Sequence, residues 1–412
     1  MMYVPPVPTG PVDESSLRYH GWRVVLACFV MAVLAWGFGF YGHGFYLAEL
    51  QRLHGWPASL ISSASTAYYL FSALLVAFVS DAIRRLGVRA CVAVGTLAFA
   101  SSAAALPFIG EPWQLFAAYL VMAFGWASMS LGAINNILGL WFRNKRGLAI
   151  SLALNGASFG GVVIVPALVF LAAAAGFKVA MLAGAGLILL LALPLTFGVL
   201  AAPVPQLHTG AGPVDASQPM WTRRSALGSP AFRGVTAFTA LALFSQAGFL
   251  VHQIAFLEPI LGRTTTGLAV AITTAMAIAG RLLLGTVVDR LDQRLASALS
   301  LVSQAAALAV MTQSANAQVL LAACAVYGFS VGNLITFPSL IIQREFEAAS
   351  FGMLIGLSTA VSQFTYAFGP GVLGLLRDAA DGYGAAIALC IALNLIAAAI
   401  VLKGPRAAPA RT

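Results

Sequence analysis

Charged residues are scarce in this chain. Only 8% of its 412 residues are Asp, Glu, Lys or Arg, whereas 60% are hydrophobic. A soluble protein usually carries about 25% charged residues, so this chain cannot cover a surface that faces water. The composition therefore excludes an ordinary soluble protein and indicates that lipid is the main solvent.

Three further features are missing. The four cysteines lie in apolar segments without the spacing of metal ligands, so we expect buried small hydrophobes and no metal. Residues 1–20 contain no apolar core, so no cleavable signal peptide is expected. Nothing matches a nucleotide-binding loop, so we expect no cofactor, and any transport must be driven by an ion gradient or by exchange.

Twelve long apolar segments are present, and a helix that crosses about 30 Å of hydrocarbon needs about 20 such residues. A polar stretch rich in Pro, Gly and Ser separates the first six segments from the last six. The sequence therefore predicts an all-α integral membrane protein with two six-helix bundles. The segments are residues 21–49, 58–80, 88–109, 113–140, 147–172, 178–201, 232–258, 266–288, 295–314, 317–341, 351–376 and 383–402.

Lysine and arginine predict the orientation, because they accumulate on the cytoplasmic side of a membrane. Cytoplasmic termini place 17 of the 22 basic residues on that side. The net charge of +9 is then a topology signal, and we expect no nucleic-acid partner. We predict a multi-pass protein of the cell inner (plasma) membrane. Its parts are a cytoplasmic N-tail at 1–20, a bundle at 21–201, a cytoplasmic linker at 202–230, a bundle at 231–402 and a cytoplasmic C-tail at 403–412.

The two halves repeat each other. Near the outer end of the first segment His43 precedes Glu49 by six residues, and near the outer end of the seventh His252 precedes Glu258 by six. The offset between the two pairs is 209 residues. Such a repeat indicates duplicated halves related by a pseudo-twofold axis.

The cytoplasmic ends of the second and eighth segments carry a second repeat, an Asp followed by arginines. Twelve helices, a central linker and these two loops together resemble the major facilitator superfamily. The first copy departs from the family pattern, with Ala77 in place of its leading Gly. The resemblance implies a usually monomeric transporter whose loop charges latch the outward-open state. The loop residues are Asp81, Arg85 and Arg89 in the first copy and Asp289, Arg290 and Arg294 in the second.

Three stretches are similar to a narrower branch of that family, the oxalate:formate antiporters and monocarboxylate transporters. They span residues 140–161, 280–290 and 337–352. In that branch an arginine on helix 8 contacts the substrate carboxylate, and Arg281 falls on its position. The antiporter also has a lysine where Ser358 stands, and the mammalian carriers have an Asp where Ala277 stands. A monocarboxylate substrate is therefore favoured over oxalate.

Arg281 is the main candidate binding residue. It lies eight residues before Asp289, which is roughly 12 Å of helix and hence near the middle of the membrane. A charge facing lipid there is costly, so the guanidinium should face the cavity between the halves. No Asp or Glu lies at mid-depth in any segment, and we expect the substrate anion to pair with it. The alternative is an arginine satisfied by backbone carbonyls, Asn or water.

His43 and His252 are the candidate proton carriers, since histidine titrates near neutral pH. The alternatives are neutral histidines in structural hydrogen bonds, or a proton carried by the substrate itself. Other polar side chains could line the cavity, although each could instead pack or bridge helices. They are Tyr41, Tyr46, Asn136, Asn155, Tyr327, Asn333, Ser358 and Gln363. Three GxxxG pairs, Gly156/Gly160, Gly328/Gly332 and Gly352/Gly356, predict close helix packing.

The sequence thus predicts a secondary transporter, not an enzyme, for a small monocarboxylate such as lactate or pyruvate. We expect proton coupling and rocker-switch alternating access, with the carboxylate on Arg281. A carboxylate:carboxylate antiporter without proton coupling is the first alternative, and an exporter of drugs or metabolites is the second. A membrane sensor would need a signalling domain, and an intramembrane hydrolase would need a nucleophile beside a base; neither is readable here.

Overall fold

The computed structural model describes residues 14–16, 18–142, 145–203, 221–287, 291–334, 336–346 and 350–405, and this part of the chain is helical between short turns. The first lobe contains α1 (His20–Trp36), the π-helix η1 (Gly37–Tyr41), α2 (Gly42–His54), α3 (Ala58–Leu86), α4 (Val88–Ala105), the 3-10 turn η2 (Leu106–Phe108), α5 (Pro112–Met129), α6 (Leu131–Trp141), α7 (Arg146–Ala175) and α8 (Phe177–Gly198).

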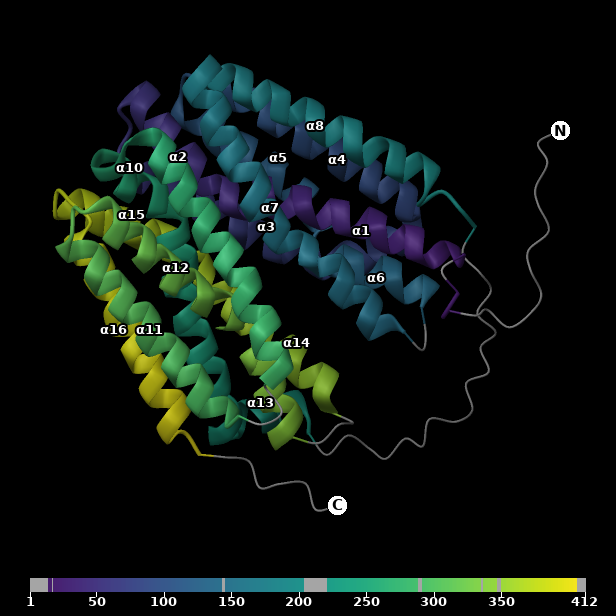
Figure 1. The fold of residues 1–412 in the computed structure, drawn as a ribbon. Helices are drawn as coiled ribbons and strands as arrows, with labels where there is room; N and C mark the ends of the chain where they lie inside the picture. Colours follow the sequence, from purple (N-terminus) through teal and green to yellow (C-terminus); the bar gives the residue numbers. More distant parts are fainter. Residues whose placement is uncertain are drawn as a thin grey trace.

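The second lobe follows a short helix, α9 (Arg223–Gly228), which falls inside the stretch predicted as a linker. This lobe contains α10 (Pro230–Val287), α11 (Gln293–Gln313), α12 (Ala317–Leu334), α13 (Phe337–Glu345), α14 (Phe351–Ala367), α15 (Gly369–Ala379) and α16 (Gly384–Lys403). The two sets of helices form two lobes, purple to teal and green to yellow in Figure 1.

These helices form twelve membrane-spanning segments, or crossings, as predicted. Ten helices are long and apolar enough to span a membrane. One of them, α10, contains two crossings, because Gly262 adopts φ 71° and turns the chain between them. A further crossing is divided into α14 and α15, each too short to span alone, with Pro370 in the first turn of α15. Proline cannot continue a helix without losing a backbone hydrogen bond.

Other crossings are also broken. The first changes to π-helical geometry over the glycine-rich stretch Gly37–Tyr41. The fourth is interrupted at Ser130, which has extended backbone angles between α5 and α6. Interruptions inside membrane helices are tolerated where the freed backbone lines a cavity or is buried in protein.

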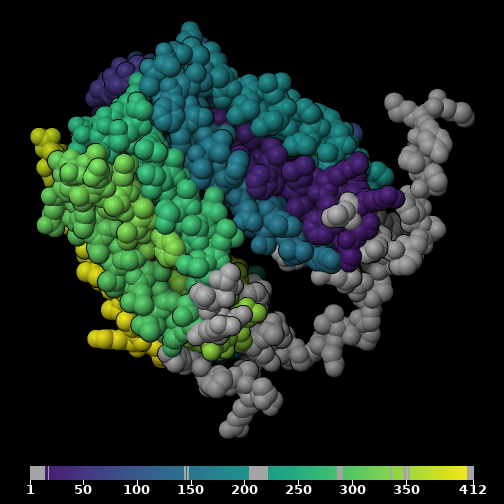
Figure 2. Space-filling model, viewed as in Figure 1, coloured from purple at the N-terminus to yellow at the C-terminus, as the bar shows by residue number. Residues whose placement is uncertain are grey.

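The lobes touch at one end of the molecule and separate toward the other (Figures 1 and 2). We call the touching side, with the turns at Gly55, Gly262 and Ala380–Tyr383, the closed end. The side that holds α6, α13, the start of α1 and the end of α16 is the open end. Figure 2 shows a hollow between the lobes there.

Glycines set how closely some helices pack. A methyl group on Gly156 or Gly160 of α7 would collide with the carbonyl oxygens of Phe29 or Val33 on α1. Gly328 and Gly332 of α12 abut carbonyl oxygens of α10 in the same way. These two pairs confirm the predicted close packing.

The third glycine pair behaves differently. Nothing lies within 4 Å of a methyl group placed on Gly356, so the prediction of close packing is wrong at this position. The spacing of two glycines does not identify the face of the helix that meets a neighbour, and Gly356 lies on an open face of α14.

Candidate functional site

Arg281 lies on the second crossing within α10 and links the lobes. Its Nη1 donates to the Ser158 hydroxyl of α7 at 3.1 Å, and its Nε donates to the Gly332 carbonyl of α12 at 3.4 Å. The side chain is half-buried. Among the described residues no carboxylate forms an ion pair with it. The guanidinium therefore has neutral partners on both sides and no protein counter-ion in this part of the chain.

Tyrosines from both lobes gather near this arginine. Tyr41 of η1 lies close enough to Arg281 to interact electrostatically with it. Tyr69 of α3 is near Tyr41, and its ring packs edge-on against Tyr366 of α14, with the centroids 5.5 Å apart. Gln363 reaches the Tyr366 hydroxyl. The arrangement places one cation beside apolar ring surface and phenolic hydroxyls, which suits an organic anion.

Asn333 and Ser358 are both buried in the second lobe. Asn333 follows Gly332, whose carbonyl accepts from Arg281, and its Oδ1 is buried without a hydrogen-bond partner in the described part. The Ser358 hydroxyl of α14 accepts from Thr236 of α10 at 3.3 Å and is almost completely buried. Ser358 thus joins two helices within its own lobe.

The contacts of Tyr46, Asn136 and Tyr327 lie elsewhere in the described part of the chain, and Asn155 lies one helical turn before Ser158. The Tyr46 hydroxyl donates to the Phe38 carbonyl at 3.0 Å inside the first lobe. Asn136 donates to the Gly132 carbonyl of its own helix at 2.8 Å, and Asn155 is half-buried on α7. Tyr327 is buried against Phe249, with centroids 4.8 Å apart.

The two histidines are buried in different environments. His43 of α2 shares a hydrogen bond of 3.2 Å between its Nδ1 and Ser65 of α3, and its Nε2 has no partner among the described residues. His252 of α10 has both nitrogens engaged, Nδ1 with the Tyr383 hydroxyl at 3.1 Å and Nε2 with the Pro370 carbonyl at 3.0 Å. The two histidines of the repeat therefore differ in hydrogen bonding: both ring nitrogens of His252 have partners, but among the described residues only one of His43 does.

Polar contacts between the lobes seal the closed end. Arg263 of α10 forms an ion pair with Glu49 of α2, which also pairs with Arg52 at 2.5 Å. The Asp378 carboxylate of α15 accepts from the backbone N–H groups of Ala58 and Ser59, at 3.3 and 2.7 Å, and so caps the first turn of α3.

Asp378 lies beyond the apolar segment at residues 351–376. Burial acts to raise the pKa of its carboxyl, but hydrogen bonds from Ser59, Arg377 and Ala58 outweigh burial and lower that pKa below its usual range. The ionised form of Asp378 is therefore favoured in the closed arrangement.

The predicted loop latch stays a prediction. Asp289 and Arg290 lie outside the described residues. Asp81 accepts from Arg84 of its own helix at 2.6 Å, and Arg85 and Arg89 are exposed at the open end.

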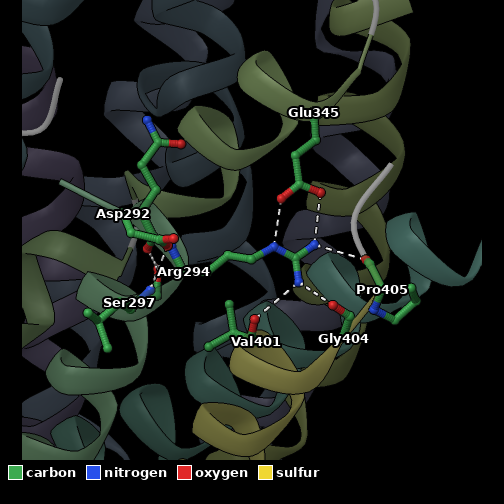
Figure 3. A network of polar contacts seen from close by, with 9 residues as sticks. Asp292, Arg294, Ser297, Glu345, Val401, Gly404 and Pro405 are labelled. Atoms are coloured by element: carbon green, nitrogen blue, oxygen red, sulfur yellow. Dashed lines mark hydrogen bonds and ion pairs between the residues drawn. The ribbon is translucent and has the colours of Figure 1, made fainter. Parts of the chain in front are cut away.

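Arg294 is almost completely buried within the second lobe, where it forms hydrogen bonds to two other helices (Figure 3). Its Nε and Nη2 donate to the Glu345 carboxylate at 2.6 and 2.8 Å. Its remaining bonds, at 3.0–3.1 Å, go to the carbonyls of Val401, Gly404 and Pro405. These bonds connect the start of α11 with the ends of α13 and α16.

Sequence reasoning missed several residues. Ser158 and Tyr366, which meet the arginine group from opposite lobes, are neutral residues in apolar helices and give no charge signal. Tyr366 does lie eight residues after Ser358, and hence on the same helix face. The pairing of Glu49 with Arg263 was unforeseen, although both residues were expected on the same side of the membrane.

Two lobes of six crossings each, with Arg281 in contact with both, form the architecture of a membrane transporter. The chain belongs to the Major Facilitator Superfamily, whose sequence profile matches residues 25–370.

Two relatives are monocarboxylate transporter 11 of Mus musculus and of Homo sapiens. Each is 26% identical over 427 aligned positions, which cover 98% of this chain and 91% or 86% of the relative. MFS-type transporter 1 of Ophiocordyceps sp. (strain BCC 1869) is 25% identical and covers 86% of this chain and 78% of its own length.

Solved structures share the fold. A mutant form of the nucleoside transporter NupG superposes with a TM-score of 0.73 at 13% identity and covers 93% of this chain and 99% of its own. The D-xylose-proton symporter gives 0.70 at 15% identity and covers 93% and 97%. A bacterial homologue of the human lysosomal transporter Spinster, in an inward-facing and unoccupied conformation, gives 0.72 at 14% and covers 96% and 100%.

Proposed function

We propose that this protein is a secondary active transporter of a small organic monocarboxylate, similar in size to lactate or pyruvate, and that transport is coupled to protons. One observation carries the proposal: Arg281 bridges the two lobes and has only neutral partners, a serine hydroxyl and a backbone carbonyl. A guanidinium matches a carboxylate in a two-pronged hydrogen-bonded geometry. The substrate carboxylate would therefore provide the counter-ion of Arg281.

The surrounding residues favour a substrate with a single charge. Ser358 stands where the oxalate antiporter has a lysine, so the second lobe offers one cation at this site. Tyr41, Tyr69 and Tyr366 provide ring surface for a short organic tail. The similarity to monocarboxylate transporter 11 supports the same substrate class.

Alternating access would proceed by rocking of the lobes around this site. If both termini are cytoplasmic, as the basic residues predict, the open end faces the cytoplasm and the structure is inward-open. Asp81 pairs within its own helix and Arg85 and Arg89 are exposed, which fits a latch that engages only when that end is closed. We further propose that the protein acts as a monomer in the plasma membrane.

Transport by protein reconstituted in proteoliposomes tests the proposal. We expect Arg281→Gln to lower counterflow of labelled lactate or pyruvate by about 100-fold, since charged hydrogen bonds worth about 3 kcal/mol are lost. Arg281→Lys keeps the charge without the fork and should recover only part of the rate.

Arg84→Gln is the matched control, because this arginine is exposed and remote from the site. Undiminished counterflow in Arg281→Gln would remove the site assignment. Uptake that ignores an imposed pH gradient but requires internal carboxylate would instead favour the antiporter without proton coupling.

A further inference from the structure

Unpartnered polar atoms gather around His43, deep in the first lobe. The Nε2 atom of His43 and the hydroxyls of Tyr68, Tyr69 and Tyr119 are all buried without a hydrogen bond of normal geometry among the described residues, and the Tyr68 and Tyr119 hydroxyls lie near Ser72 and Ser65. Buried polar groups are normally paired, so several unpaired groups in one place need an explanation. We call His43, Ser65, Tyr68, Tyr69 and Tyr119 the His43 cage.

The tyrosine rings surround the imidazole. Ring centroids of Tyr68, Tyr119 and Tyr69 lie 4.5, 4.7 and 5.4 Å from that of His43, and Tyr46 lies at 5.8 Å. An aromatic ring attracts a cation within about 6 Å of its centroid. Where their faces are turned toward it, four tyrosine rings at these distances can offset part of the cost of burying an imidazolium.

The local sequence makes room for the cage. A methyl group on Gly39 would lie 2.6 Å from the Tyr68 hydroxyl and 3.0 Å from Trp126. Gly39 lies in the π-helical stretch Gly37–Tyr41, and such bulges occur frequently at functional sites. The Gly39 carbonyl also lies beside the His43 ring, although its geometry is not that of a hydrogen bond to Nε2.

His252, at the related position, is the internal comparison. Both of its nitrogens are bonded, one to a backbone carbonyl and one to Tyr383. Its environment includes a single aromatic neighbour, Tyr383, among the ring contacts of the described residues. His252 is thus a structural tie between α10 and α15, whereas His43 retains an unused nitrogen.

The cage is continuous with the proposed substrate site. Tyr69 contacts His43 on one side and Tyr366 on the other, and it is also near Tyr41, the neighbour of Arg281. A proton on His43 and an anion on Arg281 would then lie on opposite sides of one layer of tyrosines.

We propose that the His43 cage is the binding site of the co-transported proton, a step that rests on the proposed function. Water delivers the proton: an O–H bond of hydronium breaks, and an N–H bond forms at whichever imidazole nitrogen lacks a hydrogen. The cation that results donates one N–H to Ser65 and directs the other toward the unpartnered tyrosine hydroxyls. His252 keeps its structural bonds and carries no transported proton.

No ion pair competes for His43 within the described residues. The titratable groups that contact its ring are Tyr46 on α2, Tyr68 and Tyr69 on α3 and Tyr119 on α5. On α10, which packs against α2, the charged groups toward the closed end are Glu258 and Arg263, and Arg263 pairs with Glu49.

Nitrogen-15 solid-state NMR of histidine-labelled protein in proteoliposomes tests proton binding without any substrate. We expect one histidine signal of the spanning helices to change from neutral to imidazolium between pH 8 and pH 5. The change should be absent in His43→Gln and present in His252→Gln. A His43 ring that stays neutral throughout this range would overturn the proposal.

The cage itself is tested by two variants at Tyr119 that leave the imidazole in place. Tyr119→Phe loses only the hydroxyl, whereas Tyr119→Leu also removes the ring, so Leu should lower the proton affinity of His43 by about tenfold, or one pH unit, more than Phe does. Equal affinities in the two variants would exclude the aromatic cage, and this comparison remains available if His43→Gln fails to fold.

Transport separates this inference from the proposed function. In His43→Gln we expect accumulation of labelled lactate driven by a pH gradient to disappear while lactate counterflow persists. Retained accumulation would overturn the role of His43. If wild-type protein shows no counterflow of lactate or pyruvate, the proposed function fails, and the NMR titration still decides whether the cage binds a proton.

Discussion

At the scale of single residues, Arg294 shows how one side chain can hold three helix ends. A guanidinium has five N–H donors, and Arg294 makes five hydrogen bonds, two to Glu345 and three to backbone carbonyls. All its partners lie in its own lobe (Figure 3). In this arrangement the residue stabilises the second lobe, whatever its role when the lobes rearrange.

We predict that Arg294→Lys destabilises the protein by about 3 kcal/mol, because a lysine cannot reproduce the fork to Glu345 or reach all three carbonyls. Thermal unfolding of the purified protein in detergent would measure the loss. Arg84→Lys is the control: its pair with Asp81 is exposed, so a change below about 0.5 kcal/mol is expected. Equal losses in the two variants would contradict this view of Arg294.

Residue-scale prediction from sequence relied on a charge in an apolar segment. Arg281 could be found because a guanidinium at mid-depth is costly in lipid, and the structure gives it partners from both lobes. Ser158 and Tyr366 could not be found, because a hydroxyl in an apolar helix is common and its neighbour depends on how the lobes meet. The assignment of binding roles to these residues stays a prediction.

At the scale of helices, glycine determines which pairs approach most closely. Gly332 of α12 faces the Ala277 carbonyl of α10 without space for a methyl group, whereas Gly356 of α14 faces open space. Glycine is therefore required for close packing at position 332 but not at position 356. Backbones that approach this closely gain dispersion and weak hydrogen bonds that larger residues would prevent.

Gly332→Ala should destabilise the protein by about 2 kcal/mol, since an added methyl must push α12 away from α10. Gly356→Ala, the matched control, should leave stability unchanged or raise it by up to about 1 kcal/mol, because alanine is the better helix former. Thermal unfolding in detergent measures both. The packing argument is wrong if Gly356→Ala is the more damaging change.

Helix boundaries were predicted less completely than helix number. Length and hydropathy give twelve crossings, but they do not show the π-helical stretch at Gly37–Tyr41, the break at Ser130 or the division before Gly369. These interruptions depend on backbone geometry and on neighbours that stabilise it. Proline and clustered glycine were visible signals at two of them, and Ser130 offered none.

At the scale of the whole molecule, contacts at the closed end hold one arrangement of the lobes. Arg263 and Glu49 join α10 to α2, and Asp378 caps α3 from α15. A carboxylate stabilises a helix N-terminus by accepting its free N–H groups. Separation of the lobes at this end must break both contacts.

Acid should weaken the closed end through Asp378, whose pKa its hydrogen bonds lower below the usual range. Separation of the lobes returns that pKa toward about 3.9, so protonation favours the separated form. The stabilisation is complete above about pH 4 and is lost as the pH falls below this value. Spin labels at the exposed positions Leu53 and Ala380 should move apart at acid pH, as measured by electron–electron resonance.

Asp378→Asn should increase the distance between the labels at neutral pH and reduce its response to acid. Asp381→Asn serves as the control, because Asp381 is exposed nearby and forms no ion pair within the described residues; its variant should behave as wild type. An unchanged acid response in Asp378→Asn would exclude this carboxylate as the titrating group.

The repeat in the sequence indicated two related halves, and the structure has two lobes of six crossings each. The repeat could not indicate how the lobes are tilted relative to each other. That angle is set by contacts between distant segments, such as α15 with α3, whose partners lie about 320 residues apart. Local patterns of hydropathy contain no information on such pairs.

The hydrogen bond between Arg281 and Ser158 has a consequence for the transporter when no substrate is bound. The guanidinium donates a hydrogen bond to a hydroxyl of the opposite lobe, so a substrate anion must compete with Ser158 for Arg281. If the hydrogen bond between Arg281 and Ser158 also forms in the outward-open conformation, the empty transporter can change conformation without leaving an unpaired guanidinium in an apolar interior. Ser158 would then set the balance between tight coupling and slippage.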